Sequence, residues 1–395
     1  MSYSELKEKT KALITANLTE LTGYSDYLCM HPEISGKEYE SSKKAVTLLE
    51  KHGFTVEYPF AGMDTAFKAI HGNQNHKNKV ALLAEYDALP GIGHACGHSI
   101  SGAMSMLAAI SLVQCQDELD ADIHVIGTPA EETVGTKCEM ADRGIFDDYE
   151  MAMMVHIDNQ SVPVVNMLAM DSYIYTFKGK PAHAAAAPWE GKNAFNGVQL
   201  MFHGIDMLRQ HVKPDVRMHG IIVNPGDAPN IVPEECSAEI YIRALDRRYL
   251  DKVKVMVDDC AKGAAIATQT TYSKEITASP FDNMLRVKTG IDSLYEVFDE
   301  LNIEVTGDPN QVWGSSDVGN VSFKCPSFQP LLKIANPPIA VHTREMAAIV
   351  SAEEGHKAVE KGASIIALQV IKIFSDLEKL KQIRKEFEGI TKCTI

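Results

Sequence analysis

The sequence predicts an α/β protein: a larger domain whose central mixed, largely parallel sheet is flanked by helices, with a smaller α+β domain inserted into it. Three observations support this fold class. Apolar strand-like runs alternate with helical segments up to about residue 171. Residues 172–281 change rhythm to β-α-β-β-α-β, the ferredoxin-like order. Helices and strands then alternate again, so we expect residues 1–171 and 282–395 to form one domain around the insert.

The first part of the larger domain opens with two amphipathic helices, at about 3–29 and 37–52, the second ending at Gly53. Strands follow at 54–58, 65–70 and 79–87, and the last is almost continuously apolar, as expected of a central strand. We expect a helix through the small residues of 97–113. Two further buried strands are expected at 120–129 and 149–158.

The insert reads as six elements in sequence. Strands are expected at 172–180, 217–224, 237–245 and 269–277, with helices at 193–212 and 248–268. After residue 282 the chain is expected to finish with two long helices from about 351. The last of these, rich in both charge signs, is typical of a solvated helix face.

Composition favours a globular protein that binds a small molecule or a peptide. The chain has 395 residues, 45% hydrophobic and 23% charged, with a formal net charge of -15. This charge would repel phosphate backbones and anionic lipid, so no nucleic-acid or membrane partner is expected.

The chain is also expected to be cytoplasmic. Its first 18 residues contain no unbroken apolar core of the kind that a signal peptide needs, and no later stretch is expected to span a bilayer. The eight cysteines are scattered rather than spaced as in a disulfide scaffold, which indicates a reducing compartment.

Polar residues follow the predicted strands of the larger domain. They are Asp87, Cys96 with His98, Glu131 with Glu132, His156, and His342. Ligands of open α/β sheets bind at the carboxyl ends of the strands, so these side chains are expected to converge.

Taken alone, "HACGHS" (94–99) leaves three interpretations open. Cys96 and His98 could both reach a zinc ion. The stretch could instead be a helix-capping loop with a buried cysteine and hydrogen-bonded histidines. In the third interpretation Cys96 is a nucleophile, which requires an exposed thiol of low pKa. The glycine spacing does not match a dinucleotide-binding loop.

The adjacent carboxylates of "TPAEE" (128–132) also have two interpretations. At the end of a buried strand they repel each other unless a positive group holds them. One glutamate could bind a metal while its neighbour serves as a general base. Alternatively, the pair is a solvent-exposed loop that caps the next helix. His156 and His342, each taken singly, are most simply structural histidines.

Six blocks, in order, resemble one known family. They are "LLAEYDALPGIGHACGHSISGAM", "GTPAEE", "MMVHID", "GKPAHAAAAPWEGKNA", "NIVPEECSAEIYIR" and "GSSDVGNVS". The chain resembles the dizinc aminoacylase and carboxypeptidase family (peptidase family M20), and within it the amidohydrolase branch of aminobenzoyl-glutamate hydrolases and HmrA-type proteins. The larger domain would then be catalytic, and the insert a lid and dimerisation domain.

The resemblance implies a role for each residue. Cys96, His98, Glu132, His156 and His342 would be metal ligands. Glu131 would be the general base and later the acid toward the leaving amine, and Asp87 would orient the site. His94 receives no role.

In the insert, the resemblance implies that His183 reaches the neighbouring subunit's active site and stabilises the oxyanion. Asn230 and Arg243 would hold the substrate's carboxylate. A homodimer or homotetramer through the insert is therefore expected.

Two positions depart from the family pattern. Glu85 stands where many relatives have a histidine, and Ser99 where an aspartate is common. Two Zn²⁺ sites are expected, with Mn²⁺, Ni²⁺ or Co²⁺ as substitutes. The expected activity is metal-dependent hydrolysis of the amide bond in N-acyl or N-aroyl amino acids or short peptides. An endopeptidase, a cysteine hydrolase using Cys96, and a non-catalytic metal- or peptide-binding protein remain alternatives.

Overall fold

The computed structural model describes residues 1–72, 75–312 and 314–394. The chain forms two compact units. The larger unit comprises residues 1–166, 284–313 and 317–395, and the smaller unit comprises residues 167–283 and 314–316. The predicted insert, residues 172–281, lies within the smaller unit.

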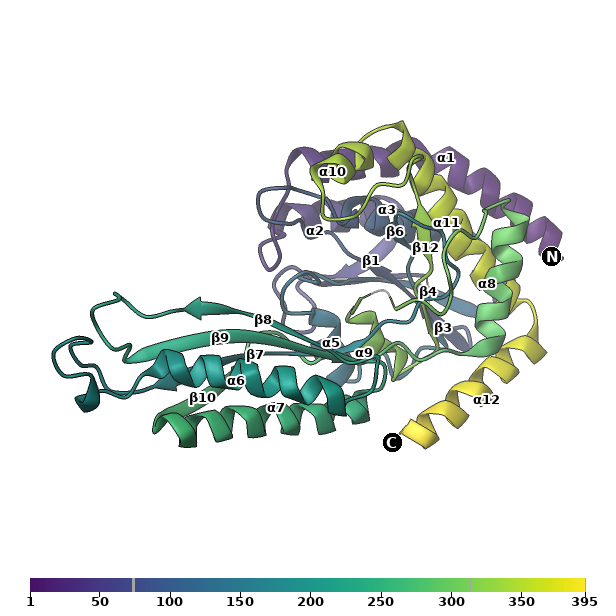
Figure 1. Cartoon of the computed structure of the whole chain (residues 1–395). Helices are drawn as coiled ribbons and strands as arrows, with labels where there is room; N and C mark the ends of the chain where they lie inside the picture. Colours follow the sequence, from purple (N-terminus) through teal and green to yellow (C-terminus); the bar gives the residue numbers. More distant parts are fainter. Residues whose placement is uncertain (73–74, 313, 395) are drawn as a thin grey trace. The chain divides into compact units, whose positions relative to one another are not determined.

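The larger unit is a helix-covered sheet (Figure 1). Its helices are α1 (Tyr3–Met30), α2 (Tyr39–Lys51), α3 (His98–Leu112), α4 (Gln116–Leu119), α5 (Thr136–Asp142), α8 (Lys288–Glu300), α9 (Val318–Ser322), α10 (Arg344–Val350), α11 (Glu353–Phe374) and α12 (Leu377–Thr394). Its strands are β1 (Phe54–Glu57), β2 (Phe67–His71), β3 (Asn78–Ala84), β4 (Ala121–Gly127), β5 (Met151–Met153), β6 (His156–Asp158), β11 (Ser327–Phe328) and β12 (Leu331–Lys333).

The main sheet of the larger unit has the strand order β1-β2-β4-β3-β5-β11. The pairs from β4 to β11 are parallel, and β1, β2 and β4 pair antiparallel, which confirms a mixed sheet. Every residue of β4 is buried, in agreement with the apolar run that predicts it. The helix α3 packs against β3 and β4, and α1 and α11 pack against α3.

The strand predicted at 149–158 is wrong as a single element. Residues Met151–Met153 pair with β3 and β11 in the main sheet, whereas His156–Asp158 pair with β12 in a separate two-stranded sheet. The opposing segment contains Pro330, between β11 and β12. Proline has no N–H to donate to a strand ladder, so the pairing breaks at this residue.

One segment of the larger unit is long and apolar enough to be considered as a bilayer span. By length and composition the segment His98–Leu119 passes that test, but 94% of its apolar window is buried inside the structure. Every residue of α3 is buried, and Gly102 allows this helix to approach the end of β3. A Cβ at Gly102 would lie 2.3 Å from the backbone oxygen of Glu85. The apolar composition therefore matches a core helix.

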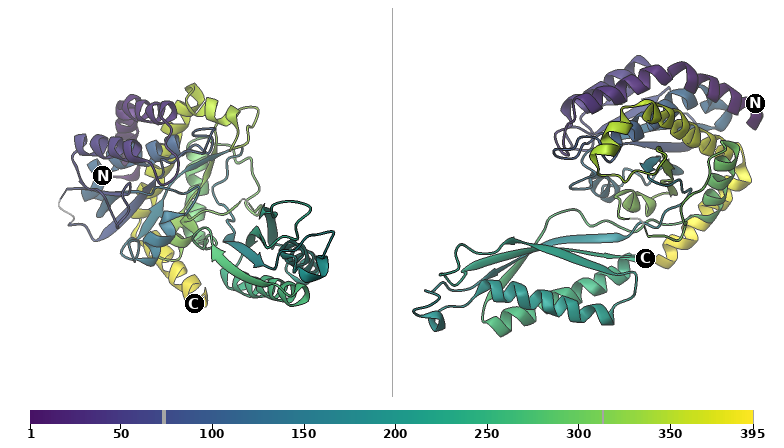
Figure 2. Two further views of the ribbon diagram at one scale, coloured as in Figure 1. Left: turned by 90° about the vertical axis from the view of Figure 1, so that its left-hand side faces the viewer. Right: turned by 45° about the horizontal axis from the view of Figure 1, so that its top comes forward.

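The smaller unit has the predicted β-α-β-β-α-β order. Its elements are β7 (Ala169–Lys178), α6 (Ala194–Leu208), β8 (Arg217–Asn224), β9 (Glu235–Ala244), α7 (Arg247–Thr268) and β10 (Thr271–Ile276). The four strands form an antiparallel sheet in the order β10-β7-β9-β8. Figure 2 shows α6 and α7 side by side on one face of this sheet, where they bury its core.

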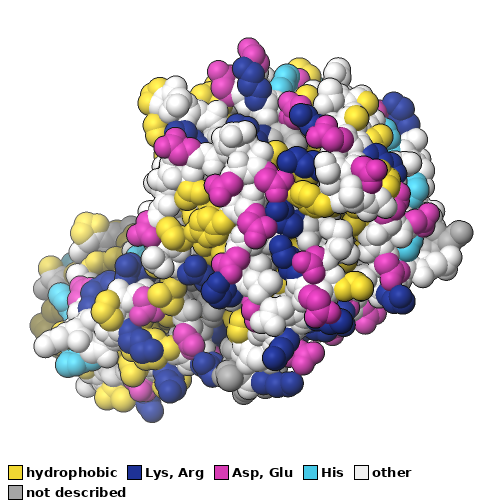
Figure 3. Space-filling model, turned by 90° about the vertical axis from the view of Figure 1, so that its right-hand side faces the viewer, with side chains coloured by type: hydrophobic (Ala, Val, Ile, Leu, Met, Phe, Trp, Pro, Cys, Tyr) yellow, Lys and Arg dark blue, Asp and Glu magenta, His cyan; other side chains and the backbone are white. Residues whose placement is uncertain are grey.

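Charged side chains of both signs are intermingled on the face of the molecule drawn in Figure 3. The acidic excess, a formal net charge of -15, is therefore not gathered into one patch on this face. Charge on this side is distributed as on an ordinary solvated surface.

Candidate active site

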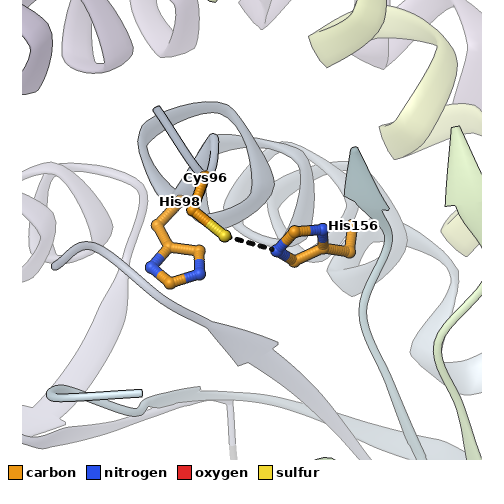
Figure 4. A group of neighbouring side chains, drawn as sticks. All are labelled: Cys96, His98 and His156. Carbon is orange, nitrogen blue, oxygen red and sulfur yellow. Dashed lines mark hydrogen bonds between the residues drawn. The ribbon is translucent and has the colours of Figure 1, made fainter. Parts of the chain in front are cut away.

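The structure brings the five predicted ligands of the larger unit together. Cys96, His98 and His156 form one group, and Cys96, Glu132 and His342 form another. In each group the potential ligand atoms lie within 4.8 Å of one another. Figure 4 shows the first group, in which Cys96 Sγ lies 3.5 Å from His156 Nε2. His342 Nε2 approaches the same sulfur to 3.3 Å.

Two backbone features hold these segments against each other. Gly97 has φ +88°, and a Cβ there would lie 2.3 Å from Ile157 Cδ1, so only glycine lets the Cys96 loop meet β6. The N–H of His342 donates to the backbone oxygen of Ala95 at 2.8 Å. His342 itself has φ +62°, a left-handed conformation that a non-glycine residue adopts only when its surroundings enforce it.

Two of the histidines are oriented through the ring nitrogen that faces away from the group. His98 Nδ1 lies 2.8 Å from Asp87 Oδ1, and His156 Nδ1 lies 2.7 Å from the backbone oxygen of Ile157. Both partners are acceptors, so each Nδ1 carries a proton and donates it. Each Nε2 is then the nitrogen available to a metal, as in carboxylate- or carbonyl-supported metal sites.

Asp87 orients two predicted ligands at once. One oxygen accepts from His98, and the other accepts from the Glu132 backbone N–H at 3.0 Å and from Ser35 Oγ at 2.6 Å. Burial opposes ionisation of Asp87, but the charge of His98 and these hydrogen bonds outweigh it and lower the pKa of this carboxyl. Asp87 thus stays charged while it fixes the side chain of His98 and the backbone of Glu132.

Glu131 and Glu132 follow β4 at a tight bend in which Ala130 has φ +57°. Their side chains are only 14% and 10% exposed, so the alternative of a solvent-exposed capping pair is wrong. Glu132 Oε1 lies 3.7 Å from His342 Nε2 and 3.9 Å from His98 Nε2. Burial, followed by repulsion from Glu85 and Asp317, raises the pKa of Glu131 well above its usual value.

The donor set fits a borderline-soft divalent cation. One thiol, three imidazoles and a carboxylate are presented, and zinc accepts all three ligand types. His98 Nε2 and Glu132 Oε1 are buried without a hydrogen-bond partner, which a cation would supply. By contrast, burial raises the pKa of the Cys96 thiol, and the side chain is 8% exposed. A cysteine nucleophile needs the opposite properties.

Sequence reasoning missed a buried ion cluster beside the ligands. The Nζ of Lys137, at the start of α5, lies 2.6 Å from Glu85 Oε1 and 2.7 Å from Asp317 Oδ1. Glu85 Oε2 in turn lies 3.4 Å from His98 Nε2. The ammonium and both carboxylates are at most 1% exposed. Asp317 lies within the family-like block "GSSDVGNVS", and this was the only signal that pointed to it.

His94, which received no role, is buried. Burial, followed by the charge of His98, lowers its pKa to about 4, so the ring is neutral near pH 7. Among the described residues it belongs to none of the candidate metal groups.

The other three predicted site residues lie in the smaller unit. His183 is exposed, and its Nδ1 accepts hydrogen bonds from the N–H groups of Ala185 and Ala186 at 3.3 and 3.1 Å. The ring proton of neutral His183 therefore lies on Nε2, which can donate outward.

Arg243 lies far from His183 and Asn230 within one chain. Asn230 is beside His183, because the N–H of Ala184 donates to the Asn230 backbone oxygen at 3.0 Å. Asn230 precedes β9, and His183 pairs with Ile231 in the same preceding segment. Arg243 is instead the next-to-last residue of that ten-residue strand. At about 3.3 Å per residue the two ends of β9 are roughly 30 Å apart. Asn230 and Arg243 of the same chain therefore do not form one pocket.

Comparisons with known proteins bear on the family and on the type of reaction. Residues 169–268 match the family model described as a peptidase dimerisation domain of the M20 type. The chain is 29% identical to the Xaa-Arg dipeptidase of Mus musculus, with 97% of this chain and 92% of that protein covered. It is 26% identical to one of the subunits of the p-aminobenzoyl-glutamate hydrolase of Escherichia coli, with 96% and 94% covered.

These comparisons support placing the chain in peptidase family M20. It is a hydrolase of amide bonds. Solved structures share its fold: an aminohydrolase from methicillin-resistant Staphylococcus aureus gives a TM-score of 0.76 at 16% identity, covering 93% of this chain and 99% of that one. The YXEP protein of Bacillus subtilis, described as a dinuclear metal-binding peptidase of the M20 family, gives 0.70 at 19% identity, with 91% and 99% covered.

Proposed function

We propose that this M20 protein is a metal-dependent amidohydrolase that cleaves N-acyl or N-aroyl amino acids or short peptides with a free carboxylate. One observation carries the proposal: Cys96, His98, Glu132, His156 and His342 converge from separate segments with a second buried carboxylate, Glu131, beside them. Zn²⁺ is the proposed metal, and Mn²⁺, Ni²⁺ or Co²⁺ could substitute. A divalent cation held there would polarise the scissile carbonyl and lower the pKa of a water molecule.

The protein's own residues supply the proton transfer. Glu131 has a raised pKa, so once ionised it is a stronger base than an exposed glutamate, and it can return the proton to the leaving amine. Asp87 holds His98 and the Glu132 backbone in place throughout. His183, with its outward Nε2–H, would donate to the oxyanion.

We propose that Arg243 binds the carboxylate of the substrate. Its guanidinium is partly buried, and its Nε has no hydrogen-bond partner. The contact made by its Nη1 is a long one, 3.4 Å to Ser315 Oγ. A buried cation without a carboxylate partner is costly, and a substrate carboxylate would satisfy it bidentately. Two relatives have names that specify substrates of this class, Xaa-Arg dipeptidase and p-aminobenzoyl-glutamate hydrolase.

We also propose that the chain works as a homodimer or a homotetramer in a reducing cytoplasm. The edge strand β8 exposes apolar Ile221, Ile222 and Val223, an arrangement that favours pairing with a second copy. Because Asn230 precedes β9 and Arg243 of the same chain lies near the end of β9, a pocket that uses both needs two chains. No disulfide occurs among the cysteines that the structure describes, which suits a reducing compartment.

A panel assay tests the activity. One batch of protein is assayed by mass spectrometry on N-acyl amino acids, aminobenzoyl-glutamate, dipeptides and longer peptides, as purified, chelated, and chelated then resupplied with Zn²⁺ or Mn²⁺. We expect cleavage of the small carboxylates that disappears on chelation and returns with metal. Cleavage that is indifferent to chelation would favour Cys96 as nucleophile. Cleavage confined to longer peptides would favour an endopeptidase. The absence of cleavage in all of these states would favour a binding role.

A further inference from the structure

The cluster around Lys137 joins three segments at the edge of the candidate metal centre. Glu85 follows β3, Lys137 is the second residue of α5, and Asp317 precedes α9. Asp317 accepts from Lys137 twice, from Nζ at 2.7 Å and from the backbone N–H at 3.1 Å. Lys137 and Asp317 have fully buried side chains, so the charge of the ammonium is balanced by Asp317 and Glu85 rather than by water.

The carboxylates of this cluster could form a metal site if the lysine were absent. Oxygen atoms of Glu85, Glu131 and Asp317 lie within 4.8 Å of one another, close enough to bind one cation. Lys137 forms ion pairs with Glu85 and Asp317 but none within 4.0 Å with Glu131 in the described part of the chain. The ammonium thus supplies positive charge to this oxygen cluster through Glu85 and Asp317. Glu131 is left without an ion pair to Lys137, and its Oε2 lies 3.9 Å from His98 Nε2.

We infer that Lys137 is a positioning residue: its ammonium occupies the oxygen cluster of Glu85, Glu131 and Asp317 in place of a divalent cation and so keeps Glu131 free for proton transfer. This inference rests on the proposed function of Glu131. It also gives Glu85 a role. Instead of adding an oxygen ligand to the metal centre, Glu85 links Lys137 to His98 by one oxygen each, at 2.6 and 3.4 Å.

The two halves of the centre would then differ in the ions they accept. The side that contains Cys96 and the imidazoles presents sulfur and nitrogen, which suit zinc. The side around Lys137 presents oxygen atoms alone, which suit Mn²⁺ or Mg²⁺. Removal of the ammonium should therefore open a site for a hard cation and should leave the zinc ligands in place.

The test is a count of bound Mn²⁺. Wild-type protein and the Lys137→Met variant, which keeps the side-chain length, are first loaded with zinc and then titrated with Mn²⁺ alone, with bound ions counted by electron paramagnetic resonance and elemental mass spectrometry. We expect Lys137→Met to bind roughly one more Mn²⁺ per chain than wild type. Adding Asp317→Asn removes one of the three carboxylates and should return the count to the wild-type value. A Lys137→Met protein with the wild-type count would overturn the inference.

A matched control separates this effect from general damage to a buried ion pair. Arg247 pairs with buried Asp171 in the smaller unit, at 2.7 Å, so Arg247→Met breaks an ion pair that is not in the unit of the metal centre. It should leave the Mn²⁺ count unchanged. If Lys137→Met is too unstable for titration, its melting temperature should rise with Mn²⁺ by more than that of wild type, because a ligand that binds only the folded state stabilises it. An equal rise in both proteins would contradict the proposal.

Kinetics provides a readout that a purely structural lysine would not change. With Mn²⁺ present, Lys137→Met should lose kcat by about tenfold or more, with KM within about twofold, because proton transfer and not substrate binding is impaired. A fall in kcat together with a rise in KM by the same factor would argue for a structural role alone. The Mn²⁺ count needs no substrate, so it decides the role of Lys137 even if the panel assay finds no hydrolysis.

Discussion

Each unit contains a cluster of ion pairs built around a buried carboxylate, and the two clusters differ in charge balance. In the smaller unit, Asp171 is 1% exposed and pairs with Arg247 and Lys254, and Asp251 pairs with the same two cations. Two carboxylates thus meet two cations. In the larger unit, Lys137 pairs with the carboxylates of Glu85 and Asp317. Three further carboxylates lie within 4.0 Å of the neighbouring His98 ring: Asp87, Glu131 and Glu132.

The difference separates a structural cluster from a functional one. The balanced cluster ties β7 to α7 and leaves no surplus charge that a ligand would have to neutralise. The unbalanced cluster carries surplus negative charge beside His98 Nε2 and Glu132 Oε1, which are buried without hydrogen-bond partners. Buried surplus charge is costly unless a bound cation compensates it. A surplus of negative charge in a cluster of ion pairs therefore indicates a metal centre, whereas the occurrence of such a cluster alone does not.

The largest expected effect comes from removing the proposed base. Glu131→Gln should lower kcat by about 10²- to 10⁴-fold, the usual contribution of a general base, and should keep the metal content of wild type. Glu139→Gln, a change to a half-exposed glutamate in the nearby helix α5, is the matched control. Steady-state kinetics and elemental analysis measure both. If Glu131→Gln retained most of the wild-type rate, the assignment of the base would be wrong.

The second-largest effect is expected at His183, in the smaller unit. His183→Ala should lower kcat by about 10²- to 10³-fold, the range for loss of one oxyanion donor. Because the side chain is exposed, the free energy of unfolding should change by less than about 0.5 kcal/mol. In mixed dimers with Glu131→Gln subunits, activity should reappear, since each chain supplies what the other lacks. Absence of this rescue would argue against a shared site.

The affinity for zinc should distinguish the two buried aspartates, Asp87 and Asp171. Asp87→Asn should weaken zinc binding by about 10- to 100-fold, because the orientation of His98 and Glu132 depends on this carboxylate. Asp171→Asn alters the balanced cluster and should leave zinc affinity unchanged. Competition with a chromophoric chelator measures both constants. Equal weakening in the two variants would remove the distinction between the clusters.

The smallest effect is a dependence of stability on pH. Burial, followed by repulsion from Lys68 and Lys79, lowers the pKa of His124 to about 3. Between pH 6.5 and about 3 the unfolded chain therefore binds a proton that the folded chain does not, so stability is full above pH 6.5 and falls on acidification. The slope should be about 1.4 kcal/mol per pH unit.

Urea unfolding of wild type and His124→Asn between pH 7 and 5 checks this slope. The variant should lose that part of the pH dependence and keep the rest. Identical slopes in the two proteins would show that His124 does not contribute.

Sequence patterns predicted the fold well where one periodicity governs a whole element. The smaller unit follows its predicted order, and strand β8 has the predicted bounds. The failure arises where tertiary context decides. The strand at 149–158 is divided because its partner contains Pro330, and the paired positions are 175 residues apart in sequence, as for Leu331 and His156. The apolar length of His98–Leu119 reflects burial on all sides, which composition alone does not distinguish from a membrane span.

For the site, the strand-end rule and the family resemblance located the residues that converge in the larger unit. They did not predict Lys137, because a lysine in "VGTKCEM" carries no pattern and its burial depends on Asp317, 180 residues away. They also did not predict that Asn230, which precedes β9, and Arg243, near the end of β9, lie far apart. The separation follows from strand length, which a motif does not encode.

X-ray absorption at the zinc edge tests the central claim, that the surplus charge belongs to a metal centre containing Cys96, most directly. For zinc-loaded wild type the account predicts a sulfur scatterer at about 2.3 Å together with nitrogen or oxygen at about 2.0–2.1 Å. In Cys96→Ser the sulfur contribution should vanish. A wild-type spectrum with nitrogen and oxygen scatterers alone, or a spectrum unchanged by Cys96→Ser, would contradict the account.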